Sequence, residues 1–328
     1  MDVLDCLANL SNDEVFTSPA VVNRMLDTLP EALWSDPNAK FLDPFTKSGV
    51  FLREIAKRLM KGLATVIPDP QERLDHILGQ QLYGIAITQL TALMARRTLY
   101  CSKDTTELAH CLTDIFAQQG NPDGNIYFAP CEHTFVKGKC SYCGATEREF
   151  GTEQRTALEQ HAYLFIHNKN PYKEMQFDVI IGNPPYQMSD GGAQASAKPI
   201  YHLFIEQAIK LNPKYICMIT PSRWFAGGKG LDDFRESMLK NKQLKEIHDF
   251  PDANEVFPGV EIKGGVNYFL WDKKYQGDCL IKTYEKGECI SALKRPLKEA
   301  AADVFIRYNE AIPILRKIQS FGEKSFVN

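Results

Sequence analysis

The stretch that most constrains this chain is Asn183-Pro184-Pro185-Tyr186, together with the apolar run 177–182 that precedes it. That run is short, rich in β-branched residues and bounded by a glycine and two prolines, which predicts a buried strand. Each proline fixes its own φ and restricts the residue before it, so the turn after the strand is rigid. Asn183 and Tyr186 are therefore expected at the carboxyl end of a strand, where open α/β sheets bind ligands.

The residue types in this turn suit recognition of an amino group. The Asn183 amide oxygen and a carbonyl exposed by the prolines can both accept hydrogen bonds from one NH2 group, while the Tyr186 ring offers a face for stacking. Two acceptors on an amine keep its lone pair directed outward, toward an electrophile. A proline-rich turn that merely ends a strand is the alternative, so other motifs must decide.

Composition sets broad limits on the class of protein. The 328 residues are 44% hydrophobic and 24% charged. No apolar run approaches the roughly 20 residues of a membrane span, and the amino terminus lacks a basic region followed by an apolar core. We therefore expect a cytoplasmic protein without a membrane partner.

Charge does not decide whether nucleic acid is a partner. The net charge of −3 is unusual for a DNA-binding protein. Residues 213–246 carry seven basic against four acidic residues, a local surplus of three. A DNA-binding track and a solvated helix face explain this surplus equally well.

A second group of motifs lies in the amino-terminal half. A predicted strand at 39–42 leads into Asp43-Pro44-Phe45-Thr46-Lys47-Ser48-Gly49 and then an amphipathic helix. A strand, a tight turn of small residues and a helix form the first ligand-binding unit of a doubly wound sheet. Residues 82–87 and 125–128 are predicted as the second and third strands. Upstream, Thr17 or Ser18 can cap a helix whose first turn contains Pro19.

Together these motifs resemble the S-adenosylmethionine-dependent, adenine-specific DNA methyltransferases of restriction–modification systems. The amino-methyltransferases share the signature Asn/Asp/Ser-Pro-Pro-Tyr/Phe after a strand, and Asn183 to Tyr186 has the form typical of the adenine-specific enzymes. Phe16-Thr17-Ser18-Pro19 is similar to their Phe-x-Thr/Ser-Pro element. Residues 43–52 follow their Asp-Pro-x-x-Gly-Ser-Gly-x-Phe-Leu pattern, except that Lys47 replaces the first glycine. The resemblance covers roughly residues 15–285.

The resemblance implies a set of functional residues. The catalytic residues would be Asn183, Pro184, Pro185 and Tyr186. The residues expected to bind S-adenosylmethionine are Phe16, Thr17, Pro19, Asp43, Pro44, Ser48, Gly49, Phe51, Ile85 and Asn183. In this fold the second strand usually ends in an acidic residue that binds the cofactor ribose, but this chain has Ala86 there. Either Thr88, Gln89 or a backbone group replaces it, or ribose recognition is weak.

Four zinc-type ligands follow the third predicted strand. Cys131-x-His133 and Cys140-x2-Cys143 lie within a short polar segment, and Gly144 follows the second pair as in a metal knuckle. Four protein ligands indicate a structural, tetrahedral zinc ion, and unmetallated thiols are the alternative. His161 and His167, further along the chain, are expected to be packing or surface residues.

The sequence therefore predicts an α/β protein with a Rossmann-like methyltransferase fold: a mostly parallel, doubly wound sheet, a C-terminal antiparallel hairpin and a small zinc-binding insertion. The hairpin is expected to pair residues 266–271 with 279–284. The catalytic domain is assigned to 1–285, with the insertion at 129–146. Residues 286–328 are expected to form a helical tail, the start of a shortened target-recognition region.

The predicted activity is methyl transfer from S-adenosylmethionine to the exocyclic amine of adenine in double-stranded DNA. The expected partners are a restriction endonuclease or a separate specificity region. Two alternatives stay open: the tetrad Asn183–Tyr186 recognises an amino group and not its scaffold, and Lys47 and Ala86 depart from the cofactor-binding pattern. One is a methyltransferase for RNA, cytosine or a protein glutamine; the other is a non-catalytic DNA-binding subunit that retains the fold.

Overall fold

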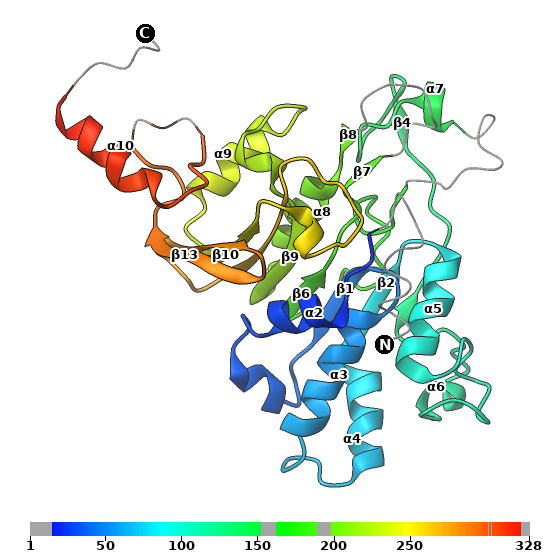
Figure 1. The fold of residues 1–328 in the computed structure, drawn as a ribbon. Coiled ribbons are helices and arrows are strands. Elements are labelled where there is room, and N and C mark those ends of the chain that lie inside the picture. The colour runs from blue at the N-terminus through cyan, green and yellow to red at the C-terminus, as the bar shows by residue number, and fades with distance from the viewer. Residues whose placement is uncertain (1–14, 152–161, 189–197, 301, 303, 323–328) are drawn as a thin grey trace.

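A computed structural model of the chain describes residues 15–151, 162–188, 198–300, 302 and 304–322. Its centre is a nine-stranded sheet in the order β13-β12-β10-β11-β9-β6-β1-β2-β3 (Figure 1). Its strands, in chain order, are β1 Phe41–Thr46, β2 Leu82–Ala86, β3 Ile126–Tyr127, β6 Val179–Gly182, β9 Tyr215–Pro221, β10 Leu244–Phe250, β11 Val266–Asp272, β12 Cys279–Glu285 and β13 Glu288–Arg295.

The strand order confirms the predicted doubly wound sheet. The five strands β3, β2, β1, β6 and β9 are parallel neighbours, and β11 runs antiparallel between β9 and β10. The chain winds outward from β1 in one direction through β2 and β3, and in the other through β6 and β9. The order therefore reverses between β1 and β6, and such a reversal opens a crevice at the carboxyl ends of the strands.

Helices cover both faces of this sheet (Figure 1). The alternation of side chains in β6 shows the two layers: Val179 and Ile181 pack with α2, α3 and α5, whereas Ile180 packs with α8 and α9. The helices are α2 Pro19–Leu26, α3 Val50–Gly62, α4 Pro70–His76, α5 Gln89–Tyr100, α6 Ile115–Gln118, α7 Glu147–Phe150, α8 Tyr201–Lys210, α9 Asp232–Lys240 and α10 Ala311–Ser320. None of the helices in the described ranges is long and apolar enough to cross a membrane.

The predicted pairing at the carboxyl-terminal end of the sheet was wrong. Strand β11 is hydrogen-bonded to β9 on one side and to β10 on the other, so it has no edge left for residues 279–284. Strand β12 instead pairs in parallel with β10 and forms the antiparallel hairpin with β13. The hairpin turns at Lys286 and Gly287, whose φ values of 52° and 80° suit a tight two-residue turn.

Residues 286–322 also differ from the expected helical tail. They contribute β13 to the main sheet before α10 begins. Arg307, between these two elements, forms an ion pair with the buried Asp249 of β10, with 2.8 Å between Nη2 and Oδ1. The division of the chain at residue 285 stays a prediction.

The predicted insertion forms a small substructure of its own. Strands β4 Phe135–Val136 and β5 Lys139–Cys140 make a two-stranded hairpin that is followed by α7. In Figure 1 this unit lies near a second hairpin, β7 Gln187–Met188 with β8 Lys198–Pro199, which flanks the catalytic tetrad in sequence. His161 lies outside the described residues.

Candidate active site and metal centre

The carboxyl ends of β1 and β6 bring three distant segments together. One narrow pocket is lined by residues 15–17, by Asn183, and by Asp43, Phe45 and residues 47–51. The predicted cofactor residues Phe16, Thr17, Asp43, Ser48, Gly49 and Phe51 all lie in its wall. The strand β1 is longer than predicted and runs through Asp43 to Thr46.

Asn183 is held in one orientation by the amino-terminal segment. Its side-chain nitrogen Nδ2 donates hydrogen bonds to the Val15 carbonyl oxygen at 2.9 Å and to Thr17 Oγ1 at 3.1 Å. A carbonyl oxygen only accepts, so Nδ2 must be the atom that faces Val15. The other amide atom, Oδ1, is buried and has no hydrogen-bond partner among the residues that the structure describes. A buried acceptor of this kind is costly unless a ligand satisfies it.

Gly182 permits β1 and the tetrad to approach each other. Its φ of 154° lies where side chains are rarely tolerated. A Cβ atom at this position would lie 2.5 Å from the Phe45 ring and 2.7 Å from Asp43 Oδ1. Only glycine therefore lets the residue before Asn183 pack directly against the cofactor strand.

Lys47, which replaces a glycine of the family pattern, is accommodated without a left-handed backbone conformation; in this loop the positive φ, of 77°, belongs to Gly49. The Lys47 side chain is buried, and its Nζ donates to the Val15 carbonyl oxygen at 3.0 Å. The lysine thus ties the cofactor loop to the amino-terminal segment.

The carboxyl group of Asp43 has a pKa close to neutral pH. Burial raises its pKa to about 7, opposed by the Phe45 amide, the Thr46 hydroxyl and the nearby Lys47 ammonium. Its Oδ1 accepts a hydrogen bond from the Phe45 amide at 3.2 Å. A cationic ligand would favour the ionised form, because an opposite charge nearby lowers a carboxyl pKa.

A second and larger pocket of about 350 Å³ lies beside β1 and β2. Two predicted residues, Pro44 and Ile85, line it, and Pro44 is adjacent in sequence to Asp43 of the first pocket. The Thr88 hydroxyl is already used: it caps α5 by accepting from the Thr91 amide at 3.1 Å. Gln89 also lines this pocket and is exposed. Between the two side chains predicted to replace the acidic ribose ligand, Gln89 is therefore better placed than Thr88.

Several residues of this pocket were missed at the sequence level. Phe128 could have been found, because it follows β3 and so lies at the same edge of the sheet as Ala86. Tyr163 and its neighbours Ala162 and Leu164 carry no motif that signals their position. Pro19, by contrast, lines neither of these two pockets and is the first residue of α2.

The other three residues of the tetrad differ in burial. Pro184 and Pro185 are buried, whereas Tyr186 is half-buried. The Tyr186 hydroxyl oxygen is itself buried, and this burial raises its pKa well above the ordinary value, so the phenol stays neutral. Tyr186 therefore offers an uncharged ring next to the Asn183 amide.

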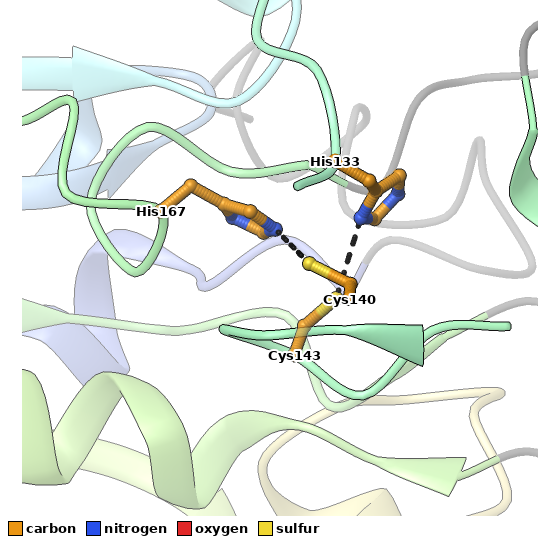
Figure 2. Close-up of side chains that lie close together, drawn as sticks. All are labelled: His133, Cys140, Cys143 and His167. Carbon is orange, nitrogen blue, oxygen red and sulfur yellow. Dashed lines mark hydrogen bonds between the residues drawn. The ribbon is translucent and has the colours of Figure 1, made fainter. Parts of the chain in front are cut away.

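A second group of reactive side chains gathers between the insertion and residues 162–170. Figure 2 shows His133, Cys140, Cys143 and His167 pointing toward one another. One nitrogen or sulfur atom from each of the four lies within 4.8 Å of all the others. The prediction that His167 is a packing or surface residue was therefore incomplete, since this buried side chain lies 3.5 Å from Cys140 Sγ.

Cys131, predicted as a metal ligand, is not part of this group of four. It is buried, its Sγ contacts the carbonyl oxygen of Glu132, and it lines the larger pocket. The sequence spacing predicted Cys131 and His133 as ligands together, but Cys131 is outside the group whose ligand atoms lie within 4.8 Å of one another. His167 takes the fourth place in the group.

The basic surplus at 213–246 is largely compensated within the protein. Five of its cations form ion pairs with carboxylates: Lys214, Arg235, Lys240, Lys242 and Lys245. Most of these side chains are exposed, and such pairs contribute little to stability. The arrangement favours the interpretation of this segment as a solvated surface.

The fold is that of an S-adenosylmethionine-type methyltransferase, and the predicted tetrad Asn183–Tyr186 lies at the carboxyl end of β6. Over residues 80–257, more than half of its length, the chain matches the family described as Eco57I restriction-modification methylase. It is 42% identical over 306 residues to an uncharacterized adenine-specific methylase of Mycoplasma pneumoniae, covering 86% of this chain and 72% of the relative.

Two solved structures share the fold at low sequence identity. A modification subunit of a putative type I restriction enzyme from Vibrio vulnificus YJ016 aligns with a TM-score of 0.50 and 15% identity, covering 95% of this chain and 54% of the subunit. The Type ISP restriction-modification enzyme LlaGI, solved as a nuclease-deletion mutant with a DNA substrate mimic, aligns with a TM-score of 0.55 and 13% identity. That match covers 92% of this chain and 32% of LlaGI, so this chain spans about half or less of these neighbours.

The chain belongs to the Eco57I restriction-modification methylase family. This membership confirms the resemblance predicted from the tetrad and the cofactor loop, and the structural neighbours confirm the Rossmann-like methyltransferase fold.

Proposed function

We propose that this protein transfers a methyl group from S-adenosylmethionine to the exocyclic amine of adenine in double-stranded DNA, as the modification component of a restriction–modification system. Membership of a restriction–modification methylase family and the 42% identity to an adenine-specific methylase support this assignment. A restriction endonuclease or a separate specificity region would act beside it.

The observation that carries the proposal is the orientation of Asn183. Its Nδ2 is anchored by Val15 and Thr17, which leaves the buried oxygen Oδ1 as an acceptor for an amino group. The Pro184 carbonyl would supply the second acceptor. With both hydrogens of the amine accepted, its lone pair points away from the tetrad, so orientation and electrostatics do most of the catalysis.

The larger pocket suits one end of the cofactor. Its volume of about 350 Å³ lies within the range of small-molecule sites, and we assign it to the adenosine part, with Gln89 contacting the ribose. The buried Asp43, next in sequence to Pro44 of that pocket, would face the cationic methionine end. When bound, the cofactor supplies an electrophilic methyl group.

Tyr186 would receive the target base. Bases are reached by flipping them out of the duplex, which costs a few kcal/mol of stacking and pairing. The neutral Tyr186 ring beside Asn183 would restore part of that stacking.

The test is calorimetric titration of S-adenosylmethionine combined with methyl transfer to mixed-sequence duplex DNA, using wild type and Asn183→Ala. We expect the wild type to bind the cofactor, Asn183→Ala to bind it more weakly because Asn183 lines the narrow pocket, and only the wild type to produce N6-methyladenine by mass spectrometry of digested DNA. Methylcytosine, or transfer to RNA or protein alone, would replace the adenine assignment with another amine. Absence of cofactor binding by the wild type would favour a non-catalytic subunit.

We also propose that the group of two histidines and two cysteines holds a structural Zn²⁺ ion, because thiolates and imidazoles are preferred ligands of zinc.

A further inference from the structure

We infer that His133, Cys140, Cys143 and His167 form a zinc clamp that fixes one wall of the cofactor pocket. The clamp would join the insertion to the segment that leads into the catalytic strand β6. Its effect on cofactor binding rests on the proposed function, whereas its metal binding does not.

The ligand distances match a tetrahedral site. Zinc bonds of about 2.3 Å to sulfur and about 2.0–2.1 Å to nitrogen place neighbouring sulfur and nitrogen ligands about 3.6 Å apart. Cys140 Sγ lies 3.5 Å from His167 Nε2, and Cys143 Sγ lies 3.4 Å from His133 Nδ1 (Figure 2). Both cysteines and His167 are buried, so few water molecules compete for the metal.

Hydrogen bonds to the backbone orient His167 and close the turn that carries the two cysteines. His167 Nδ1 donates to the Tyr163 carbonyl oxygen at 2.8 Å, which leaves the lone pair on Nε2, the nitrogen that faces Cys140. Metal-binding histidines are commonly oriented by such a second hydrogen bond. The Cys140–Cys143 turn closes through the Gly144 amide, which donates to the Cys140 carbonyl oxygen at 2.9 Å, with Gly144 at a φ of 68°.

The same two segments form part of the cofactor pocket. Cys131 lines the pocket and His133 is a ligand two positions later. Tyr163 lines the pocket and its carbonyl anchors His167. A metal that holds His133 and His167 together therefore also fixes the wall of the pocket that these two segments form.

The regular secondary structure of the insertion is small. Its strands β4 and β5 have two residues each, and an isolated two-stranded hairpin is marginal in water. Metal binding supplies folding free energy to small units of this kind.

The first experiment measures metal in the purified full chain by inductively coupled plasma mass spectrometry. We expect one zinc per chain in the wild type, loss of zinc in His167→Asn and Cys143→Ser, and retention in Cys131→Ser. Replacement of zinc by Co²⁺ should give the visible absorption of a tetrahedral site with sulfur-to-cobalt charge transfer. A metal-free wild type that also fails to bind Co²⁺ would overturn the clamp, as would zinc retained in His167→Asn but lost in Cys131→Ser.

The second experiment compares S-adenosylmethionine affinity in the zinc-loaded and the chelator-treated chain. We expect affinity to fall on the order of tenfold without zinc, with far-UV circular dichroism nearly unchanged because the main sheet does not contain the clamp. His167→Asn should behave like the stripped protein, and Cys289→Ser, at an exposed cysteine of β13, like the wild type.

The outcomes separate the two proposals. A zinc-loaded wild type that does not bind the cofactor contradicts the proposed function and leaves the metal result standing. Unchanged affinity after zinc removal overturns the coupling of the clamp to the pocket. Unfolding of the whole chain on zinc removal also overturns it, because the clamp would then support the entire fold and not one wall.

Discussion

Lys47 and Asn183 donate hydrogen bonds to the same atom, the carbonyl oxygen of Val15, at 3.0 and 2.9 Å. One residue comes from the cofactor loop and the other from the catalytic tetrad. A residue that departs from the family's glycine-containing loop therefore shares an acceptor with Asn183, the residue that we propose to be catalytic.

The first prediction concerns this lysine. Lys47→Met keeps the apolar stem but removes the donor, and hydrogen bonds from charged groups contribute about 1.5–3 kcal/mol. We expect S-adenosylmethionine affinity and kcat each to fall by an order of magnitude or so, measured by calorimetry and initial rates. Lys47→Arg retains a cationic donor and should lose less. Wild-type behaviour of Lys47→Met would contradict the role of Lys47.

The second prediction concerns the other anchor of Asn183. Thr17→Val preserves the shape of the side chain but removes the acceptor of Asn183 Nδ2, whereas Thr17→Ser retains a hydroxyl. The amide of Asn183 should then reorient more often, so kcat falls more than the KM for DNA changes. If Thr17→Val and Thr17→Ser showed equal kcat, the hydroxyl would have no orienting role.

The third prediction is a pH dependence of cofactor binding. Burial raises the pKa of Asp43 to about 7, so its carboxylate forms only as the pH rises through this value. Affinity for the cationic cofactor should therefore increase across the same pH range, and Asp43→Asn should abolish the increase. Calorimetric titrations at several pH values test this, and a flat profile in the wild type would contradict it.

The raised pKa of Asp43 also makes the stability of the cofactor-free protein depend on pH. The folded-state pKa is higher than the ordinary value of 3.8, so the folded protein holds this proton more tightly than the unfolded chain. The Asp43 contribution is full at low pH and is lost as the pH rises toward about 7. Denaturant titrations of wild type and Asp43→Asn should converge at low pH and separate progressively between the two pKa values of 3.8 and about 7, with the variant more stable at the upper end.

The fourth prediction concerns Gly182. Gly182→Ala would place its Cβ 2.5 Å from the Phe45 ring in addition to imposing an unfavourable φ, so we expect a loss of roughly 2–4 kcal/mol in the free energy of unfolding. Gly228→Ala is the matched control: its φ is 78°, and no atom lies within 4 Å of the added Cβ. Equal losses in the two variants would show that steric contact with β1 is unimportant.

Much of the site was predictable because its motifs are local in sequence. Asp43 lies in the carboxyl half of β1 and Asn183 directly follows β6, and parallel strands present their carboxyl ends at one edge. Their meeting at the β1–β6 reversal therefore needed only the strand order. The hydrogen bond of Lys47 could not be predicted, because its acceptor is a backbone carbonyl, that of Val15, which lies 32 positions away and which no side-chain pattern marks.

The side chains that we propose to bind zinc show where local spacing fails. Cys140 and Cys143 are fixed by one tight turn, so their spacing alone identifies them. His167 follows Cys140 by 27 positions, and only the fold brings it back. Strand β12 was mispaired for a related reason: alternation of apolar residues predicts a strand but not which neighbour it joins.

The hydrogen bond between Asn183 and Val15 spans 168 positions of the chain. Contacts of such large sequence separation form late during folding, because the intervening loop must first lose its freedom. The cofactor strand and the tetrad can each mature as local units, but the acceptor geometry of Asn183 is completed only when the amino-terminal segment docks. Catalytic competence should therefore lag behind the acquisition of secondary structure during refolding.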